Sequence, residues 1–302
     1  MISWINKKEF NQHSYVMYRN NSAKKSLELN VEEVINKYTY LDYNKAYKIV
    51  ELIKKYIPKP LSGVGLELGA GTGIFSSILA SNNINHIYAI ELVPALAELV
   101  IPRVAKKYLQ NKKGKVIPVH GSFDNIKLPD ESIDFIFEYD SFHHSNDLKN
   151  TFFESYKKLK SGGTLIMFDK CHSDSLSDEE IDDMLNITFS KELLKDQGLH
   201  EDLIITRRQN GEHEYRKQEW LSAIKDCGFK VLLFRKFYNK VHLKQLYWYI
   251  LSKFKLKNEY HQNLILIFLA QRFGIIFENS IGITPMKETG FKGKTLGILQ
   301  KL

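Results

Sequence analysis

The chain has 302 residues, of which 43% are hydrophobic and 26% charged, and its formal net charge is +8. This length and balance suit a globular protein with one sizeable core and some additions. The first residues lack an apolar signal-peptide core, and the apolar run at 264–270 is too short to span a bilayer. The two cysteines, Cys171 and Cys227, lie far apart and form no CxxC motif. We therefore expect a cytoplasmic protein without a disulfide framework.

The positive charge gathers in the last quarter of the chain. Residues 231–302 contain 12 lysines and arginines against three acidic residues, whereas the first 230 residues are close to neutral. A basic segment suits an anionic partner, such as a phosphorylated small molecule, a membrane surface or a nucleic acid. A solvated lysine-rich surface with nothing bound explains the charge equally well.

The first part of the chain alternates between helical and strand-like patterns. Amphipathic periodicity predicts helix over 31–57, most clearly over 43–56, and Pro58 ends it. Strands are expected at 64–68, 86–92, 115–121, 132–140 and 164–170, with helices between them and a turn at 161–163. Strands that alternate with helices indicate a parallel sheet covered on both faces.

The second part adds further elements to this core. A capping box at 177–180 opens a helix, another helix is expected at 217–229, and a sixth strand at 230–237. The last eight residues, 295–302, have the pattern of a final strand. The domains expected are an N-terminal helical cap (1–60), a core (61–237) with a helical insertion at about 172–216, a basic aromatic helical insertion (238–293), and the last strand (294–302).

The stretch GLELGAGTGIF at 65–75 is a glycine-rich loop between a strand and a helix. Its spacing is GxGxG, and the position that carries the third glycine of a dinucleotide-binding GxGxxG motif is Ile74. Glu67, two residues before the first glycine, would repel a pyrophosphate. An adenosine that carries an amino acid would meet no such repulsion, so the loop favours that kind of ligand.

Residues 65–73 resemble motif I of the class I S-adenosylmethionine-dependent methyltransferases, often written [ED]xGxGxG. The resemblance continues in register through 121–134, 135–147 and 156–169, and it covers roughly residues 40–237 and the final strand. It implies a doubly wound α/β fold with a mostly parallel, seven-stranded Rossmann-like sheet and helices on both faces. An N-terminal helical cap and a C-terminal helical insertion before the last strand complete this expectation. The implied cofactor is S-adenosyl-L-methionine, and the implied product is S-adenosyl-L-homocysteine.

The resemblance also implies which residues hold the cofactor. The loop glycines lack a Cβ, so the backbone can approach the methionine portion. Glu67 is expected to attract the ammonium group, and Glu91, at the end of the second strand, to accept both ribose hydroxyls. Leu92 packs on the adenine in this interpretation, or else is an ordinary core leucine. The expected cofactor-binding residues are Glu67, Gly69, Ala70, Gly71, Gly73, Glu91, Leu92, Phe123, Asp124 and Glu138.

One position departs from the family pattern. Many members have an aspartate directly after the glycine that matches Gly121, where it contacts the adenine amine, but this chain has Ser122. We expect Asp124 and the main-chain amide of Phe123 to take over this contact. Asp124 serves equally well as a turn residue.

Methyl transfer needs an acceptor atom held in line with the methyl group and, for many acceptors, a base that removes a proton. Candidates are expected just after the fourth and fifth strands, because ligands of such sheets bind beyond the strands' carboxyl ends. Asp140, His143 and His144 are the expected catalytic residues, although Asp140 also suits a helix cap. Asp169 and His172 form a second candidate pair. No metal is expected, because no metal-binding spacing such as HxxxH occurs.

The acceptor is less constrained by the sequence. The [ND]PP[YF] tetrapeptide of adenine and amide methylation and a Pro-Cys nucleophile for cytosine are both absent. We expect O- or N-methylation of a small or glycan-linked, anionic acceptor. The alternatives are an RNA or DNA methyltransferase that uses the basic C-terminal segment, and a non-catalytic partner protein that binds S-adenosylmethionine. Residues 238–293 also suit peripheral contact with a membrane.

Overall fold

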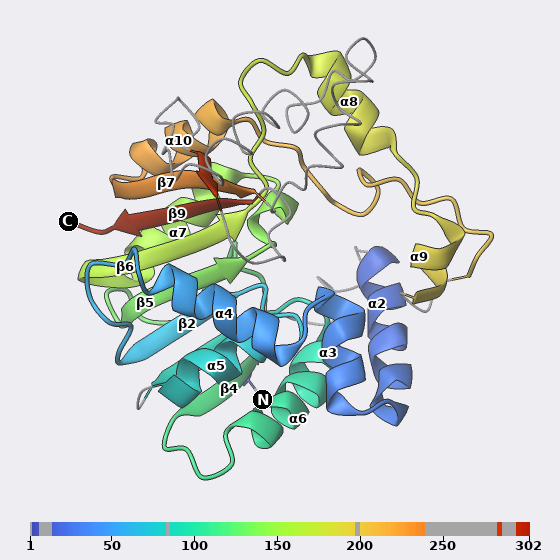
Figure 1. Ribbon diagram of the computed structural model, residues 1–302, viewed down its shortest axis with the longest axis horizontal. Helices are drawn as coiled ribbons and strands as arrows, with labels where there is room; N and C mark the ends of the chain where they lie inside the picture. Colours follow the sequence, from blue (N-terminus) through green and yellow to red (C-terminus); the bar gives the residue numbers. More distant parts are fainter. Residues whose placement is uncertain (1, 6–13, 83–84, 197–199, 239–282, 286–293) are drawn as a thin grey trace.

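The computed structural model describes residues 2–5, 14–82, 85–196, 200–238, 283–285 and 294–302 (Figure 1). The strands are β1 (Ile2–Ser3), β2 (Val64–Leu68), β3 (His86–Glu91), β4 (Lys115–His120), β5 (Ile133–Tyr139), β6 (Leu159–Asp169), β7 (Lys230–Tyr238), β8 (Ile283–Pro285) and β9 (Thr295–Gln300). The α-helices are α2 (Ser14–Lys25), α3 (Val31–Thr39), α4 (Tyr43–Ile53), α5 (Ile74–Asn82), α6 (Ile101–Tyr108), α7 (Leu148–Lys158), α8 (Asp178–Asn186), α9 (Lys191–Asp196) and α10 (Lys217–Asp226).

The described strands form one sheet in the order β1-β4-β3-β2-β5-β6-β9-β7-β8. All neighbours are parallel except β9, which runs antiparallel to both β6 and β7. Seven of the strands, from β4 to β7 in this order, form the predicted mostly parallel sheet. The short strands β1 and β8 extend it at the two edges and were not predicted.

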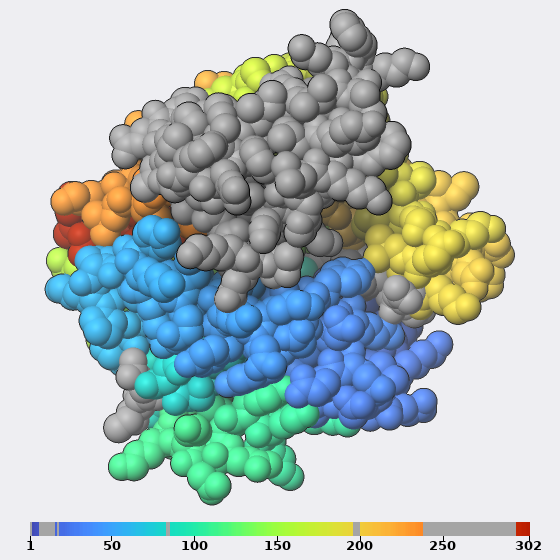
Figure 2. All heavy atoms as spheres, viewed as in Figure 1, coloured from blue at the N-terminus to red at the C-terminus, as the bar shows by residue number. Residues whose placement is uncertain are grey.

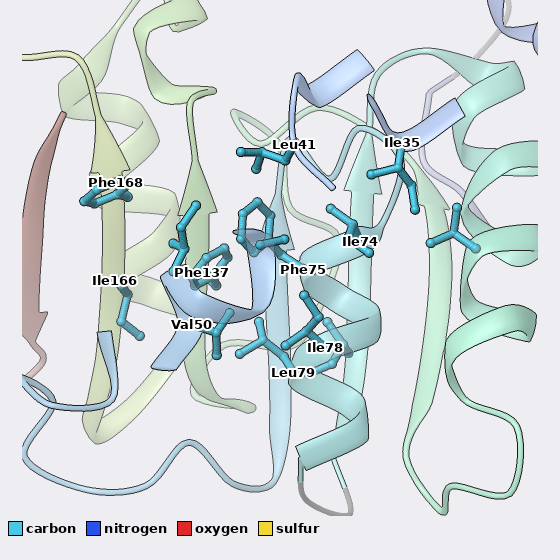
Figure 3. Packing of buried hydrophobic residues seen from close by; sticks show 14 of the residues in the cluster. Ile35, Leu41, Val50, Ile74, Phe75, Ile78, Leu79, Phe137, Ile166 and Phe168 are labelled. Carbon is cyan, nitrogen blue, oxygen red and sulfur yellow. The ribbon is translucent and has the colours of Figure 1, made fainter. Parts of the chain in front are cut away.

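Apolar side chains on the two faces of the sheet build two buried clusters. On one face α4 and α5 cover β2, β5 and β6, with Val50, Phe75 and Phe137 in contact (Figure 3). On the other face α7 and α10 bury Phe152 and Trp220 against the sheet. This double coverage confirms the α/β fold expected from alternating strands and helices.

Helix caps and polar contacts with α6 hold the N-terminal helices in place. Asn30 caps α3 in a capping box with Glu33, and Asp42 caps α4. The Arg103 guanidinium of α6 donates to the carbonyls of Leu27 and Leu29 at 3.1 and 2.6 Å. In Figure 2 these helices (blue) form a continuous layer beside the green surface near α6.

Several boundaries differ from the prediction for local reasons. The helix predicted over 31–57 is broken at Tyr40, whose φ of +54° is left-handed and cannot continue a helix. The turn predicted at 161–163 lies within β6, where Gly162 has φ of +75° and the pairing with β5 shifts register. Residues 283–285 form a strand rather than the predicted helix, and the rest of the predicted insertion from 239 to 293 lies outside the described residues.

Three of the described connections contain short helical segments. These are η1 (Ser26–Glu28), the π-helical η2 (Leu96–Val100), which runs directly into α6, and η3 (Phe142–His144) after β5. Within the part of the chain that the structure describes, no helix has both the length and the apolar character needed to cross a bilayer.

Candidate functional site

The glycine loop between β2 and α5 has three residues in the left-handed region: Gly69, Gly71 and Gly73 have φ of +71°, +54° and +76°. They face different surroundings. A Cβ on Gly69 would lie 2.4 Å from the Cβ of Ser141, and one on Gly73 would lie 2.9 Å from Cγ2 of Ile101. A Cβ on Gly71 would meet nothing within 4 Å. Side chains of the protein itself therefore lie close to Gly69 and Gly73, whereas Gly71 alone of the three borders open space.

Glu91, the last residue of β3, supports this loop from below. Its Oε2 accepts a hydrogen bond from the Gly71 amide at 2.7 Å, and its Oε1 accepts one from the Val93 amide at 2.8 Å. The residue is 8% exposed. Burial raises the pKa of its carboxyl, although the two hydrogen bonds act in the opposite direction. A carboxylate can accept more hydrogen bonds than these two, so Glu91 could also accept the ribose hydroxyls expected from the sequence.

Glu67, in β2, lies on the other side of the loop and is almost fully buried. Its Oε2 accepts a 2.7 Å hydrogen bond from the Ser76 amide at the start of α5, and the Ser76 hydroxyl donates to the same oxygen. Burial, aided by Glu91, raises the pKa of Glu67 to about 8. Among the described residues, Oε1 of Glu67 makes no hydrogen bond, so this oxygen is the one that suits a ligand's ammonium group.

Glu138 is fully buried and joins three strand ends. Its carboxylate accepts from the amides of Ser141, Phe142 and Phe168, and Ser141 in turn donates to the Leu68 carbonyl at 2.8 Å. Burial and the nearby Asp169 raise the pKa of Glu138 well above its usual range. The residue therefore holds β2, β5 and β6 together beside the loop, a structural function that the sequence did not reveal.

The remaining residues expected at the cofactor lie around the same strand ends. Ala70 is buried, and its amide donates to the Ile90 carbonyl at 2.8 Å. Leu92 is partly buried against the α5 side of the core. The centres of the Phe123 and Phe142 rings lie 5.7 Å apart. The Asp124 carboxylate accepts a hydrogen bond from the hydroxyl of Thr151 in α7. This internal contact favours the turn alternative for Asp124 and leaves the Phe123 amide as the stronger candidate for the adenine edge.

His143 and Asp169 form the most buried ionisable pair at the ends of β5 and β6. Nδ1 of His143 lies 2.7 Å from Oδ1 of Asp169, and the His143 amide donates to Oδ2 at 2.9 Å. His143 is 5% exposed and Asp169 is fully buried. Burial opposes ionisation, yet His143 and Lys294 hold the pKa of Asp169 well below its usual range. The carboxylate thus fixes both the position and the orientation of the imidazole.

Asp140 is strained and ion-paired rather than a helix cap. Its φ is +58°, a conformation unusual for aspartate, and its carboxylate is bonded to the ammonium of Lys294. Ligand atoms of Asp140, His143 and Asp169 lie within 4.8 Å of one another, a spacing that could suit a metal ion. Because Lys294 already supplies a cation to Asp140 and His143 is bonded to Asp169, we assign no metal there.

His144 faces a charged loop that precedes α10. Its Nδ1 lies 3.1 Å from the Gly211 carbonyl, and burial next to His143 lowers its pKa to about 3. In the same loop Glu212 binds Lys170 at 2.7 Å and Arg207 at 2.9 Å. Glu214 binds both Arg207 and His172. The second pair expected from the sequence, Asp169 with His172, is therefore not formed, because each residue has another partner.

Comparison with known proteins agrees with this architecture. Residues 66–167 match the family model described as a methyltransferase domain. A search of the curated proteins gave no match. Among solved structures, the chain is similar to the complex of the Trm112 methyltransferase activator and a methyltransferase from Haloferax volcanii, at 12% identity and a TM-score of 0.52, covering 96% of this chain and 98% of that chain.

A second similar structure is geranyl diphosphate C-methyltransferase from Streptomyces coelicolor, in complex with Mg²⁺, geranyl diphosphate and S-adenosyl-L-homocysteine. It is 13% identical, with a TM-score of 0.50, and the match covers 87% of this chain and 78% of that chain. These similarities to solved structures establish the fold. The matched family model identifies residues 66–167 as a methyltransferase domain.

Proposed function

We propose that this protein transfers a methyl group from S-adenosylmethionine to an oxygen or nitrogen atom of a small or glycan-linked acceptor. The observation that carries the proposal is the position of Gly71, which borders open space and is bonded to the buried Glu91. The bound cofactor supplies an activated methyl group, and the protein has to hold it, position the acceptor and accept a proton.

The residues around the loop support the cofactor part of the proposal. Gly71 would admit the methionine portion, Glu91 would accept the ribose hydroxyls, and Oε1 of Glu67 would face the ammonium group. Leu92 and the Phe123 amide are the candidates for the adenine. Glu138, Gly69 and Gly73 act indirectly in this scheme. Glu138 accepts hydrogen bonds from the amides of Ser141, Phe142 and Phe168, and a Cβ on Gly69 or Gly73 would meet Ser141 or Ile101.

His143 is the candidate that would accept the acceptor's proton. Its Nδ1 is engaged by Asp169, so Nε2 is the nitrogen that would face an acceptor. The buried carboxylate stabilises the imidazolium that forms, in the same way as the acid of a hydrolase triad. His144 is a weaker candidate, because its low pKa makes it a poor proton acceptor near neutral pH.

The proposed negative charge of the acceptor comes from the sequence of the basic segment. The described cations near His143, which are Lys170, Arg207 and Lys294, are each paired with a carboxylate. An anionic acceptor is therefore proposed from the basic sequence of the 238–293 segment. The same sequence is the sole support for the alternative of an RNA or DNA methyltransferase.

The test uses S-adenosylmethionine with a labelled methyl group. The protein is incubated with a small-molecule extract, with glycoconjugates, and separately with total RNA, DNA and protein, and the incorporated label is measured. Label in the first two pools supports the proposal, whereas label in polynucleotide supports the alternative. Binding of the cofactor by calorimetry without transfer to any pool would indicate a non-catalytic protein.

A further inference from the structure

Lys294 is a buried lysine at the point where the chain enters β9. It is 5% exposed, and its carbonyl accepts a 2.8 Å hydrogen bond from the Phe237 amide of the neighbouring strand β7. Its ammonium binds Oδ1 of Asp140 and lies 5.2 Å from the centre of the Tyr139 ring. A buried ammonium is costly unless it is paired, so these contacts fix Lys294 at the end of β5.

The paired oxygen of Asp140 is also the one nearest to His143. Oδ1 of Asp140 lies 3.8 Å from Nδ1 of His143, and Oδ1 of Asp169 lies 2.7 Å from the same nitrogen. Two carboxylates therefore face one imidazole N–H. Lys294 is ion-paired with the carboxylate of Asp140, and the Nδ1 of His143 is hydrogen-bonded to the carboxylate of Asp169.

We propose that Lys294 is a positioning residue, which holds Asp140 and leaves Asp169 as the acid partner of His143. This inference rests on the proposed function, in which His143 accepts a proton through Nε2. Without the ammonium, the Asp140 carboxylate would stabilise the protonated imidazole more strongly. His143 would then keep its proton to a higher pH and would be a poorer base at neutral pH.

Other charged groups also surround His143, and the test has to leave them unchanged. From the described segments packed against it, these groups are Asp140 directly after β5, Asp169 of β6, His144 of η3, Lys294 directly before β9, and Glu212 and His213 of the loop before α10. Glu212 is held by Lys170 and Arg207. A substitution at Lys294 removes the partner of Asp140 without removing a partner of that loop.

A lysine that directly follows β9 provides a matched control. Lys301 is 7% exposed, and its ammonium binds Glu131 at 3.2 Å and the Leu159 carbonyl at 2.8 Å. Its amide pairs with the carbonyl of Gly163, at the opposite end of the sheet from Asp140. Replacing Lys301 therefore removes a buried, ion-paired lysine next to the same strand, at a distance from His143.

The experiment is an NMR titration of the His143 ring in the full-length protein, with His143→Gln to assign the signal. Lys294→Met should raise the titration midpoint by about one pH unit. Lys301→Met should leave it unchanged, and Lys294→Arg, which keeps the charge, should stay near wild type. In the double variant Asp140→Asn with Lys294→Met most of the shift should disappear, because the competing carboxylate is gone.

Two results would overturn the inference. The first is a midpoint that moves no further in Lys294→Met than in Lys301→Met. The second is a full shift that persists in the Asp140→Asn background, which would mean that Lys294 acts directly on His143. The double variant replaces an ion pair by a neutral pair, so it tests the inference even if Lys294→Met does not fold. The titration needs no acceptor, so it tests the role of Lys294 separately from methyl transfer. Full methyl transfer by His143→Gln would refute His143 as the base whatever the titration shows.

Discussion

The amide of Gly71 donates a 2.7 Å hydrogen bond to the carboxylate of Glu91, so the end of β3 fixes the middle of the glycine loop. The other oxygen of this carboxylate accepts from the amide of Val93. One buried side chain thus sets both the loop after β2 and the first turn after β3. We therefore expect a substitution at either residue to weaken the binding of the cofactor.

Glu91→Ala should weaken the binding of S-adenosylmethionine by about 1.5–3 kcal/mol, the range for hydrogen bonds to a charged group. The loss has two sources, the proposed ribose contact and the support of the Gly71 amide. Isothermal titration calorimetry measures it. Glu98→Ala, on the exposed side of η2, is the control and should leave the affinity unchanged. Equal affinity in both variants would place the ribose elsewhere.

Gly71→Ala should abolish detectable cofactor binding, because a Cβ would enter the open space beside the loop. The substitution also forces alanine to a φ of +54°, which costs about 1–2 kcal/mol of stability. Calorimetry and urea unfolding separate these two effects.

Gly162→Ala is the matched control for the backbone strain. Gly162 has a φ of +75°, and a Cβ there also meets nothing within 4 Å, but the residue lies in β6 far along the chain from the loop. We expect similar destabilisation in both variants and normal cofactor binding in Gly162→Ala. Normal binding by Gly71→Ala would contradict the proposed contact between the glycine loop and the cofactor.

His143→Gln and Asp169→Asn should both reduce kcat by about 100-fold or more while changing cofactor affinity little. In the first variant the proposed base is lost, and in the second the imidazole loses the carboxylate that orients it. The rate at which the labelled methyl group is transferred to the acceptor measures this effect, with His86→Gln at the exposed start of β3 as the control. A normal rate in His143→Gln would assign the proton transfer to another group.

Glu67→Gln should stabilise the protein increasingly as the pH rises. The folded protein keeps the Glu67 proton up to about pH 8, whereas an unfolded chain loses it near 4.5. Between these values the folded state binds more protons, so the free energy of unfolding of wild type falls by up to about 1.4 kcal/mol per pH unit. Glutamine does not ionise and escapes this loss.

Urea unfolding at about pH 5.5 and about pH 7.5 tests the sign of this effect. The advantage of Glu67→Gln over wild type should be larger at the higher pH, and Glu98→Gln should show no such trend. A constant difference would mean that Glu67 is ionised in the folded protein throughout this range.

Much of the fold could be predicted because its signals are local. The strands β2, β3, β4 and β5 coincide with short apolar runs, and the capping box at Ser177 opens α8 where its sequence pattern placed it. The pairing of β9 between β6 and β7 was not predicted, because it joins segments far apart in sequence. The length of β6 was also missed, since Gly162 and Gly163 indicate a turn but are accommodated by a register shift.

In the candidate site, too, the residues that are close in sequence could be predicted, and the contacts between distant segments could not. The loop and both glutamates come from one contiguous motif and its neighbouring strand, so sequence alone could find them. The partner of His143 could not be found that way, because Asp169 and His172 are closer in sequence than Asp169 and His143 are. Lys294 belongs to no motif, and only the antiparallel course of β9 brings it to Asp140.

This course of β9 also has a consequence for how the molecule assembles. No hydrogen bonds join β6 directly to β7, and the strand between them comes from a segment more than 50 residues later in the chain. Until that segment arrives, β6 has an open edge that another chain could pair with. Closing so long a loop is slow, so we expect the insertion of β9 to be a late step of folding and the stage most exposed to aggregation.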